Sequence, residues 1–121
     1  MKTIRTHRDL DVWKMSVELA LTLYRLTEDF PPHEKFGLVA QIRRAGISIC
    51  SNIAEGAARS HPKEFIQFLY HAQGSAAEIE TQLEISLMLG YLQTIDIEKE
   101  KLKEIRQMIS ALIKAISQKV H

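Results

Sequence analysis

Hydrophobic residues recur three and four positions apart along almost the whole chain, which is the spacing of α-helices with one buried side. Leu38, Ile42, Ala45, Ile49 and Ile53 form one such row. No stretch alternates hydrophobic and polar residues with the period of two that strands require. The pattern predicts helices over about residues 10–29, 32–57, 62–89 and 96–120. Short links between amphipathic helices favour an all-α, up-down-up-down four-helix bundle.

Prolines and a glycine mark the ends of these helices. Pro31 and Pro32 break the first helix and set the start of the second, because proline cannot continue a helix but suits its first position. Pro62 begins the third helix in the same way, and Gly90 ends it. On the first helix, Trp13 and Tyr24 lie on a row that faces the core.

Two of the predicted helices have more apolar surface than one bundle can bury. The last helix has a single apolar row and charged residues elsewhere, whereas the second and third are apolar or small on two sides. The extra residues are Ala40, Ile47, Ser51 and Ala54 on the second helix and Tyr70, Gly74, Ala77 and Thr81 on the third. This surplus predicts an interface with a partner, most simply another copy of the chain.

Arg44 lies on the second helix, which is expected to be buried on most sides, and a buried arginine needs a carboxylate partner. The second and third helices are joined by a turn near residue 60, so facing positions add up to about 120 by helix geometry. Arg44 is then within one turn of Glu78 or Glu80, and we expect a structural ion pair. The alternative is a contact with nucleic-acid phosphates.

A polar edge follows the second helix at Gln41, Ser48, Asn52 and Glu55. It fits, in this order, a solvated flank, a seam of hydrogen bonds between helices, or a binding surface.

No motif supports catalysis or a metal site. The single cysteine, Cys50, fits a small buried residue without a companion histidine, and His71 fits a structural or exposed position. The chain has no Glu-x-x-His motif of the kind that bundles use to hold metals, and no glycine-rich phosphate loop. We therefore expect no enzymatic activity, no metal and no cofactor.

The 121 residues suit one domain, residues 9–121, preceded by a flexible basic arm, residues 1–8. The net charge of +1 argues against a strongly basic nucleic-acid binder but allows a local patch. The candidate contacts are Lys2, Arg5, Arg8, Lys14, Arg43 and Arg59. The start of the chain has no secretory signal and no segment is long enough for a membrane span, so a cytoplasmic location is expected.

Several short motifs together resemble the four-helix bundle proteins named for intervening sequences in bacterial 23S ribosomal RNA genes. They are Asp9-Leu10-x-Val12-Trp13, Phe30-Pro31, Phe36-Gly37-Leu38, Gln41-Ile42-Arg43-Arg44-Ala45, Ser48-Ile49, Asn52-Ile53-Ala54-Glu55-Gly56, and Gly74-Ser75 with Glu78. The resemblance covers about residues 8–92.

The resemblance implies a bacterial cytosolic protein that forms a homopentamer of four-helix bundles and has no established enzymatic activity. It also implies kinship with the accessory protein of diversity-generating retroelements, which binds nucleic acid and a reverse transcriptase. Two functions follow as hypotheses: a self-assembling interaction or scaffold protein, and a nucleic-acid-binding accessory factor.

Overall fold

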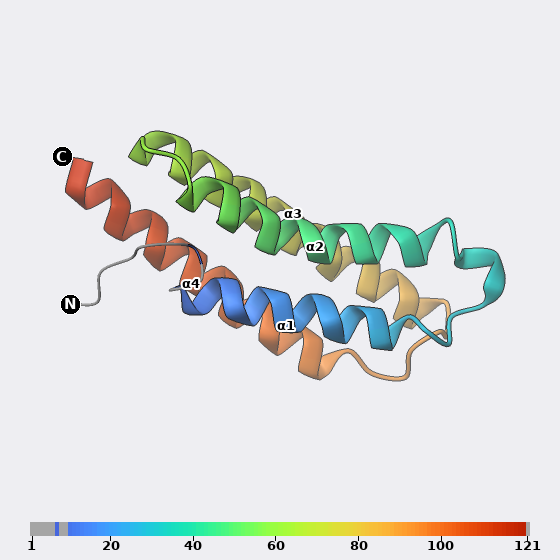
Figure 1. The fold of residues 1–121 in the computed structure, drawn as a ribbon. Helices are drawn as coiled ribbons and strands as arrows, with labels where there is room; N and C mark the ends of the chain where they lie inside the picture. The colour runs from blue at the N-terminus through green and yellow to red at the C-terminus, as the bar shows by residue number, and fades with distance from the viewer. Residues whose placement is uncertain (1–6, 8–9, 121) are drawn as a thin grey trace.

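Figure 1 shows the computed structural model of the chain, which describes residue 7 and residues 10–120. Its helices are α1 (Asp11–Leu26), α2 (Leu38–Ala57), α3 (Pro62–Met88) and α4 (Asp96–Val120). A short 3₁₀ helix, η2 (Pro32–Glu34), lies between α1 and α2. All regular structure in the described ranges is helical, which confirms the prediction of an all-α chain with four main helices.

Each helix packs against its neighbours in sequence, and α1 also packs against α4. The chain reverses direction at every connection, so that α1 begins and α4 ends at the same end of the molecule (Figure 1). Among the described residues, the backbone of α1 does not closely approach that of α3, nor does the backbone of α2 closely approach that of α4. The face formed by α1 and α2 therefore lies opposite the face formed by α3 and α4.

The core is built from the predicted apolar rows. Leu23 of α1, Ile42 and Ile49 of α2, Leu83 of α3 and Ile105 of α4 are all fully buried. Gly56 lies where α2 and α3 approach closely, since a Cβ atom there would be 2.8 Å from the Cβ of Phe68. Small and branched side chains thus set the distances between helices.

The predicted start of the second helix is wrong. Pro32 begins only the short helix η2, and α2 begins six positions later, at Leu38. Gly37, with φ −106° and ψ −109°, interrupts the helical path between the two. At the end of α3 the prediction is confirmed, because Gly90 has a φ of +82° and the Tyr91 N–H donates to the Ser86 carbonyl at 2.9 Å.

Candidate interaction surfaces

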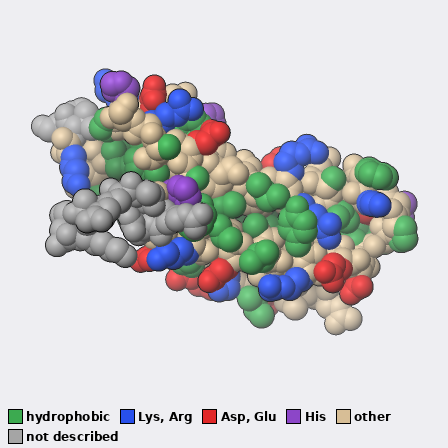
Figure 2. Space-filling model, in the orientation of Figure 1, with side chains coloured by type: hydrophobic (Ala, Val, Ile, Leu, Met, Phe, Trp, Pro, Cys, Tyr) green, Lys and Arg blue, Asp and Glu red, His purple; other side chains and the backbone are tan. Residues whose placement is uncertain are grey.

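An apolar groove runs between α1 and α2 on the surface of the molecule. Its cavity of about 280 Å³ is lined by α1 and α2 residues: Val17, Ala20, Leu21, Tyr24, Ile47 and Cys50. Leu21 is 51% exposed, Ile47 43% and Tyr24 39%, which is unusual for side chains of this size. Figure 2 shows hydrophobic side chains gathered on this face.

The groove is shallow because the two helices lie close together. Gly46 allows this approach, since a Cβ at this position would lie 2.8 Å from the Cδ1 of Leu23 on α1. Cys50 is half-buried in the groove wall, and its thiol donates to the carbonyl of Ile47 at 3.2 Å. Burial raises the pKa of the Cys50 thiol, which disfavours the reactive thiolate.

A basic pocket continues the groove toward the start of α2. The cavity of about 440 Å³ is lined by Tyr24, Lys35, Phe36, Val39, Ala40, Arg43, Arg44 and Ile47. This lining has three cationic side chains and no carboxylate, and Phe36 on its edge is 88% exposed. We call the apolar groove and the basic pocket together the α1/α2 groove.

Arg43 is held firmly at the wall of this pocket. Its Nε donates to the Thr27 hydroxyl at 3.0 Å, and its Nη2 donates to the Tyr24 carbonyl at 3.1 Å. The guanidinium carbon also lies 4.5 Å from the centre of the Tyr24 ring. These contacts fix Arg43 of α2 on the C-terminal turn of α1, where a cation is favourable for the helix dipole.

A second exposed row lies on the outer side of α3, and we call it the α3 stripe. It consists of Tyr70, Gly74, Ala77, Thr81, Ile85 and Met88, which are all exposed. The three large members are exposed by 60%, 44% and 84% at Tyr70, Ile85 and Met88. The spacing of four, three, four, four and three residues places them along one side of the helix.

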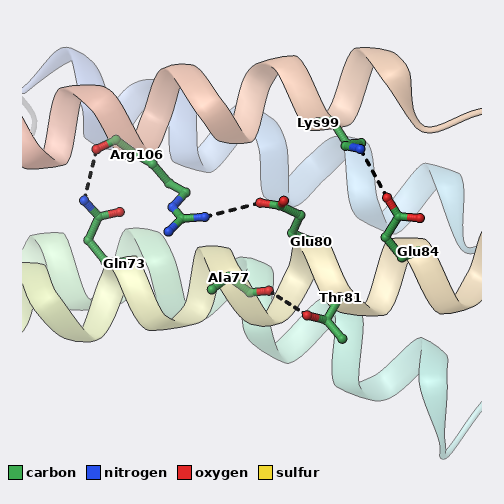
Figure 3. Close-up of polar contacts among 7 residues, drawn as sticks. All are labelled: Gln73, Ala77, Glu80, Thr81, Glu84, Lys99 and Arg106. Carbon is green, nitrogen blue, oxygen red and sulfur yellow. Dashed lines mark hydrogen bonds and ion pairs between the residues drawn. The ribbon is translucent and has the colours of Figure 1, made fainter.

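Ion pairs to α4 border this stripe. Glu80 accepts from Arg106 at 3.3 Å, and Glu84 accepts from Lys99 at 3.2 Å. Figure 3 shows both carboxylates directed toward α4; along α3, Thr81 lies between them and Ala77 precedes Glu80. The stripe therefore belongs to the α3/α4 side of the molecule, opposite the α1/α2 groove.

A hydrogen bond between two serines joins α2 to α3, and an asparagine of α2 supports it. The hydroxyls of Ser48 and Ser75 are 2.8 Å apart, and the Asn52 amide donates to the Ser48 carbonyl at 2.8 Å and hydroxyl at 3.0 Å. Of the three interpretations of the polar edge, the hydrogen bond between helices applies to Ser48, which Asn52 supports from its own helix. Gln41 and Glu55 are exposed and belong to its solvated flank.

The connections at one end of the molecule are locked to each other. The Tyr91 hydroxyl donates to Glu34 Oε2 at 2.8 Å, and the Leu38 N–H donates to Glu34 Oε1 at 3.3 Å. The hydrogen bond from Tyr91, and then that from Leu38, lower the pKa of Glu34. The lock fixes η2, and with it Lys35 and Phe36 at the edge of the basic pocket.

The hydrogen bonds to Glu34 make the stability of the fold depend on pH in a defined direction. Because the pKa of Glu34 is lowered on folding, its contribution is complete above the ordinary carboxyl pKa of about 4 and is lost as the pH falls through the lowered value. We expect Tyr91→Phe to be less stable than the wild type by a constant amount near neutral pH. The difference shrinks below about pH 4, as measured by urea unfolding.

The control for this measurement is Tyr91→Phe made in a Glu34→Gln background, where position 34 carries no carboxylate for the Tyr91 hydroxyl to bind. The effect of Tyr91→Phe in that background is expected to be the same across the acid range. A constant difference for Tyr91→Phe across the acid range would contradict the role of Glu34.

Residues 8–114 match the family model of the 23S rRNA-intervening sequence protein. The chain belongs to this family. Among solved structures it is similar to a protein of unknown function from the S23 ribosomal protein family of Bacteroides thetaiotaomicron VPI-5482. The TM-score is 0.76 and the sequence identity 29%, over 85% of this chain and 95% of that one. A search of curated proteins found no match.

The residues predicted for an interface on the second apolar sides of α2 and α3 lie at the surface, but the structure does not bring them together on one face. Ala40 and Ile47 line the α1/α2 groove, whereas Ala77 and Thr81 lie on the α3/α4 side. Ser51 is exposed and Ala54 half-buried on α2, and Tyr70 and Gly74 are exposed on α3. The sequence analysis missed the contribution of α1, from Val17 and Leu21.

Tyr24 is a further correction. The sequence placed it on the core-facing row, but its ring lies at the surface, with the Arg43 guanidinium stacked on it. Trp13, placed on the same row, is half-buried. The sequence indicated the exposure of this turn of α1 only weakly. Its one sign was that Leu21 lies outside both apolar rows of the helix.

The predicted buried ion pair of Arg44 is wrong within one chain. Arg44 is exposed, and Glu80 pairs with Arg106 instead. The predicted level along the helices is confirmed, because Arg44 and Glu78 line the same depression of about 350 Å³ between α2 and α3. Arg44 lies on the outer side of α2, where water solvates its charge.

The candidate nucleic-acid contacts do not form one patch in the described residues. Lys2, Arg5 and Arg8 lie outside them. Lys14 and Arg59 are exposed near the end where α1 begins and α2 ends, and Arg59 lies 4.9 Å from the centre of the Phe68 ring. Arg43 lies nearer the opposite end and is engaged by Tyr24 and Thr27.

No group of three His, Cys, Asp or Glu side chains within the described ranges could hold a metal ion. Over the same part of the chain, no helix combines the length and apolar character needed to cross a bilayer.

Proposed function

We propose that the chain is a non-enzymatic interaction or scaffold protein that works as a homo-oligomer in the cytoplasm. The observation that carries the proposal is the pair of exposed apolar surfaces on one small chain, the α1/α2 groove and the α3 stripe. Monomeric proteins rarely expose contiguous apolar patches unless these bind something. The number of copies, five, rests on the family resemblance.

The titratable side chains nearest to one another, and the single cysteine, have structural roles, and this supports a non-enzymatic function. Glu34 and Tyr91, which approach His33 Nε2 to 3.8 Å and 3.4 Å, hold the connections before α2 and after α3. Cys50 has a raised pKa and donates to its own helix. These side chains stabilise the fold and leave the two apolar surfaces as the features without a partner in a single chain.

Light scattering coupled to size-exclusion chromatography tests the assembly. We expect the purified chain at micromolar concentration to have five times the mass of the 13.8-kDa polypeptide. The sample is run with and without nuclease, so that assembly through bound nucleic acid is separated from assembly through protein surfaces. A monomer mass in both runs contradicts the proposal.

Nucleic-acid binding stays a prediction of the sequence and the family resemblance. The contacts described above do not favour it, because Arg43 is engaged within the chain and Lys14 and Arg59 are distant from it. The scaffold role is therefore the function that we carry forward.

A further inference from the structure

We propose that His33, Glu34 and Tyr91 form a binding site for a divalent transition-metal ion, and that Zn²⁺ is the cation it takes. The three donor atoms are the Nε2 of His33, the Oε2 of Glu34 and the hydroxyl oxygen of Tyr91. The site goes beyond the proposed function, since all three ligands belong to one chain and the metal binds whether or not copies assemble.

The spacing of the three donor atoms is that of ligands around one small cation. The Tyr91 hydroxyl oxygen lies 2.8 Å from Glu34 Oε2 and 3.4 Å from His33 Nε2, and Oε2 and Nε2 are 3.8 Å apart. Ligands of a tetrahedral zinc ion, with bonds of about 2.1 Å, lie about 3.4 Å from one another. An ion about 2.1 Å from each atom therefore fits this triangle without movement of any donor atom.

The types of the donor atoms favour zinc over the common alkaline-earth cations. An imidazole nitrogen and a carboxylate oxygen are both regular zinc ligands, whereas Ca²⁺ and Mg²⁺ take oxygen ligands. Zn²⁺ has no geometric preference from its d electrons, so it accepts a phenol oxygen as the third ligand. The His33 side chain is 72% exposed, so the ion can enter from solvent and a water molecule can complete the coordination.

Neighbouring groups orient the two less exposed ligands. Glu34 Oε1 accepts the Leu38 N–H at 3.3 Å, which leaves Oε2 directed at Tyr91. The carboxylate has room there because of Gly37, where a Cβ would lie 3.1 Å from Oε1. The Tyr91 ring packs on the buried ring of Phe30, with 5.2 Å between the ring centres. Support of this kind, from groups outside the ligand set, is a regular feature of metal sites.

A bound cation would replace a proton of the metal-free chain. In that chain the Tyr91 hydroxyl donates its proton to Glu34. On metal binding this proton passes to solvent, and both oxygens become ligands. The ion then joins η2 to the connection between α3 and α4, and Figure 1 shows these two segments at the same end of the molecule.

The sequence motifs did not reveal this set of ligands for two reasons. Tyr91 lies 57 positions after Glu34, so the set has none of the short spacing of a Glu-x-x-His motif. The third ligand is also a phenol, and a group of three drawn from His, Cys, Asp and Glu alone does not include it.

Isothermal titration calorimetry of the untagged full chain, freed of metals by a chelator and titrated with zinc chloride, tests the site. We expect one Zn²⁺ to bind per chain. His33→Ala is the most selective variant, because it leaves the hydrogen bond between Tyr91 and Glu34 intact. We expect it to weaken zinc binding by about 100-fold or more, since even the loss of groups outside a ligand set costs roughly 10- to 100-fold.

The matched control is His61→Ala, which removes an exposed histidine at the other end of α2, next to the start of α3. This variant is expected to keep the wild-type affinity for zinc. Urea unfolding gives a second readout, because a ligand that binds only the folded chain stabilises it. Zinc is expected to raise the urea midpoint of the wild type and of His61→Ala, and to leave that of His33→Ala unchanged.

Ultraviolet difference absorbance tests the third ligand. We expect zinc to produce a tyrosinate band in the wild type and no such band in Tyr91→Phe. Absence of the band in the wild type, or wild-type affinity in Tyr91→Phe, overturns the three-ligand site.

The histidine variants decide whether zinc binds at this place. No saturable binding by the wild type, or wild-type affinity in His33→Ala, overturns the site. Equal losses in His33→Ala and His61→Ala also overturn it, because they would mean that zinc binds exposed histidines without selection.

Discussion

Replacing Gly56 with alanine is expected to lower the free energy of unfolding by about 3 kcal/mol. The added Cβ would lie 2.8 Å from the Cβ of Phe68 and 3.3 Å from the carbonyl oxygen of Phe65. Neither atom is the free end of a flexible side chain, so the start of α3 must move away from the end of α2. Urea unfolding at a fixed protein concentration measures the loss.

Gly46→Ala is the matched control for this substitution. There the added Cβ would lie 2.8 Å from the Cδ1 of Leu23, a terminal methyl that can rotate away, and 3.6 Å from the nearest backbone atom, the Cα of Ala20. We expect a cost of about 1 kcal/mol, at the lower limit of overpacking. Equal stabilities for Gly56→Ala and the wild type would show that α2 and α3 do not need this close approach.

The second large expected effect is a difference in stability between variants of two adjacent arginines, Arg43 and Arg44. Arg43→Ala is expected to lower the free energy of unfolding by about 2 kcal/mol, because it removes charged hydrogen bonds to the Thr27 hydroxyl and the Tyr24 carbonyl. Arg44→Ala is expected to change it by less than about 0.5 kcal/mol, since Arg44 is exposed and forms no ion pair within the described chain.

The comparison is made by urea unfolding of both variants at the same protein concentration. A large loss for Arg44→Ala would restore the original expectation of a structural ion pair. Equal small losses for both would mean that the contacts of Arg43 with α1 contribute little to stability.

The helices and their core-facing rows could be predicted because they depend on local spacing. A row such as Ile42, Ile49 and Ile53 identifies its buried side without knowledge of any other helix. The start of α2 could not be found in this way, because it depends on Glu34, whose carboxylate binds both the Leu38 N–H and a tyrosine 57 positions away. A proline marks where a helix can begin. Whether the helix then continues depends on contacts with residues far away in the sequence, such as that between Glu34 and Tyr91.

The candidate surfaces were only partly predictable for a related reason. Helical spacing shows that α2 and α3 each have a second side, but it does not show which neighbouring helix that side borders. The rule that placed Arg44 within one turn of Glu78 or Glu80 gives a position along the helix axis and no rotation around it. Tyr24 was misplaced because it borders the groove beside Ile47 of α2, and spacing within the first helix does not show where the neighbouring helix lies.

The return of the chain to its starting end has a practical consequence for spectroscopy. Since α1 begins and α4 ends at the same end of the molecule (Figure 1), donor and acceptor dyes on exposed Lys14 of α1 and Lys119 of α4 both lie toward that end in the folded chain. Energy transfer between them reports folding over nearly the whole sequence. The locked end, where Tyr91 binds Glu34, stays unlabelled and undisturbed by this probe.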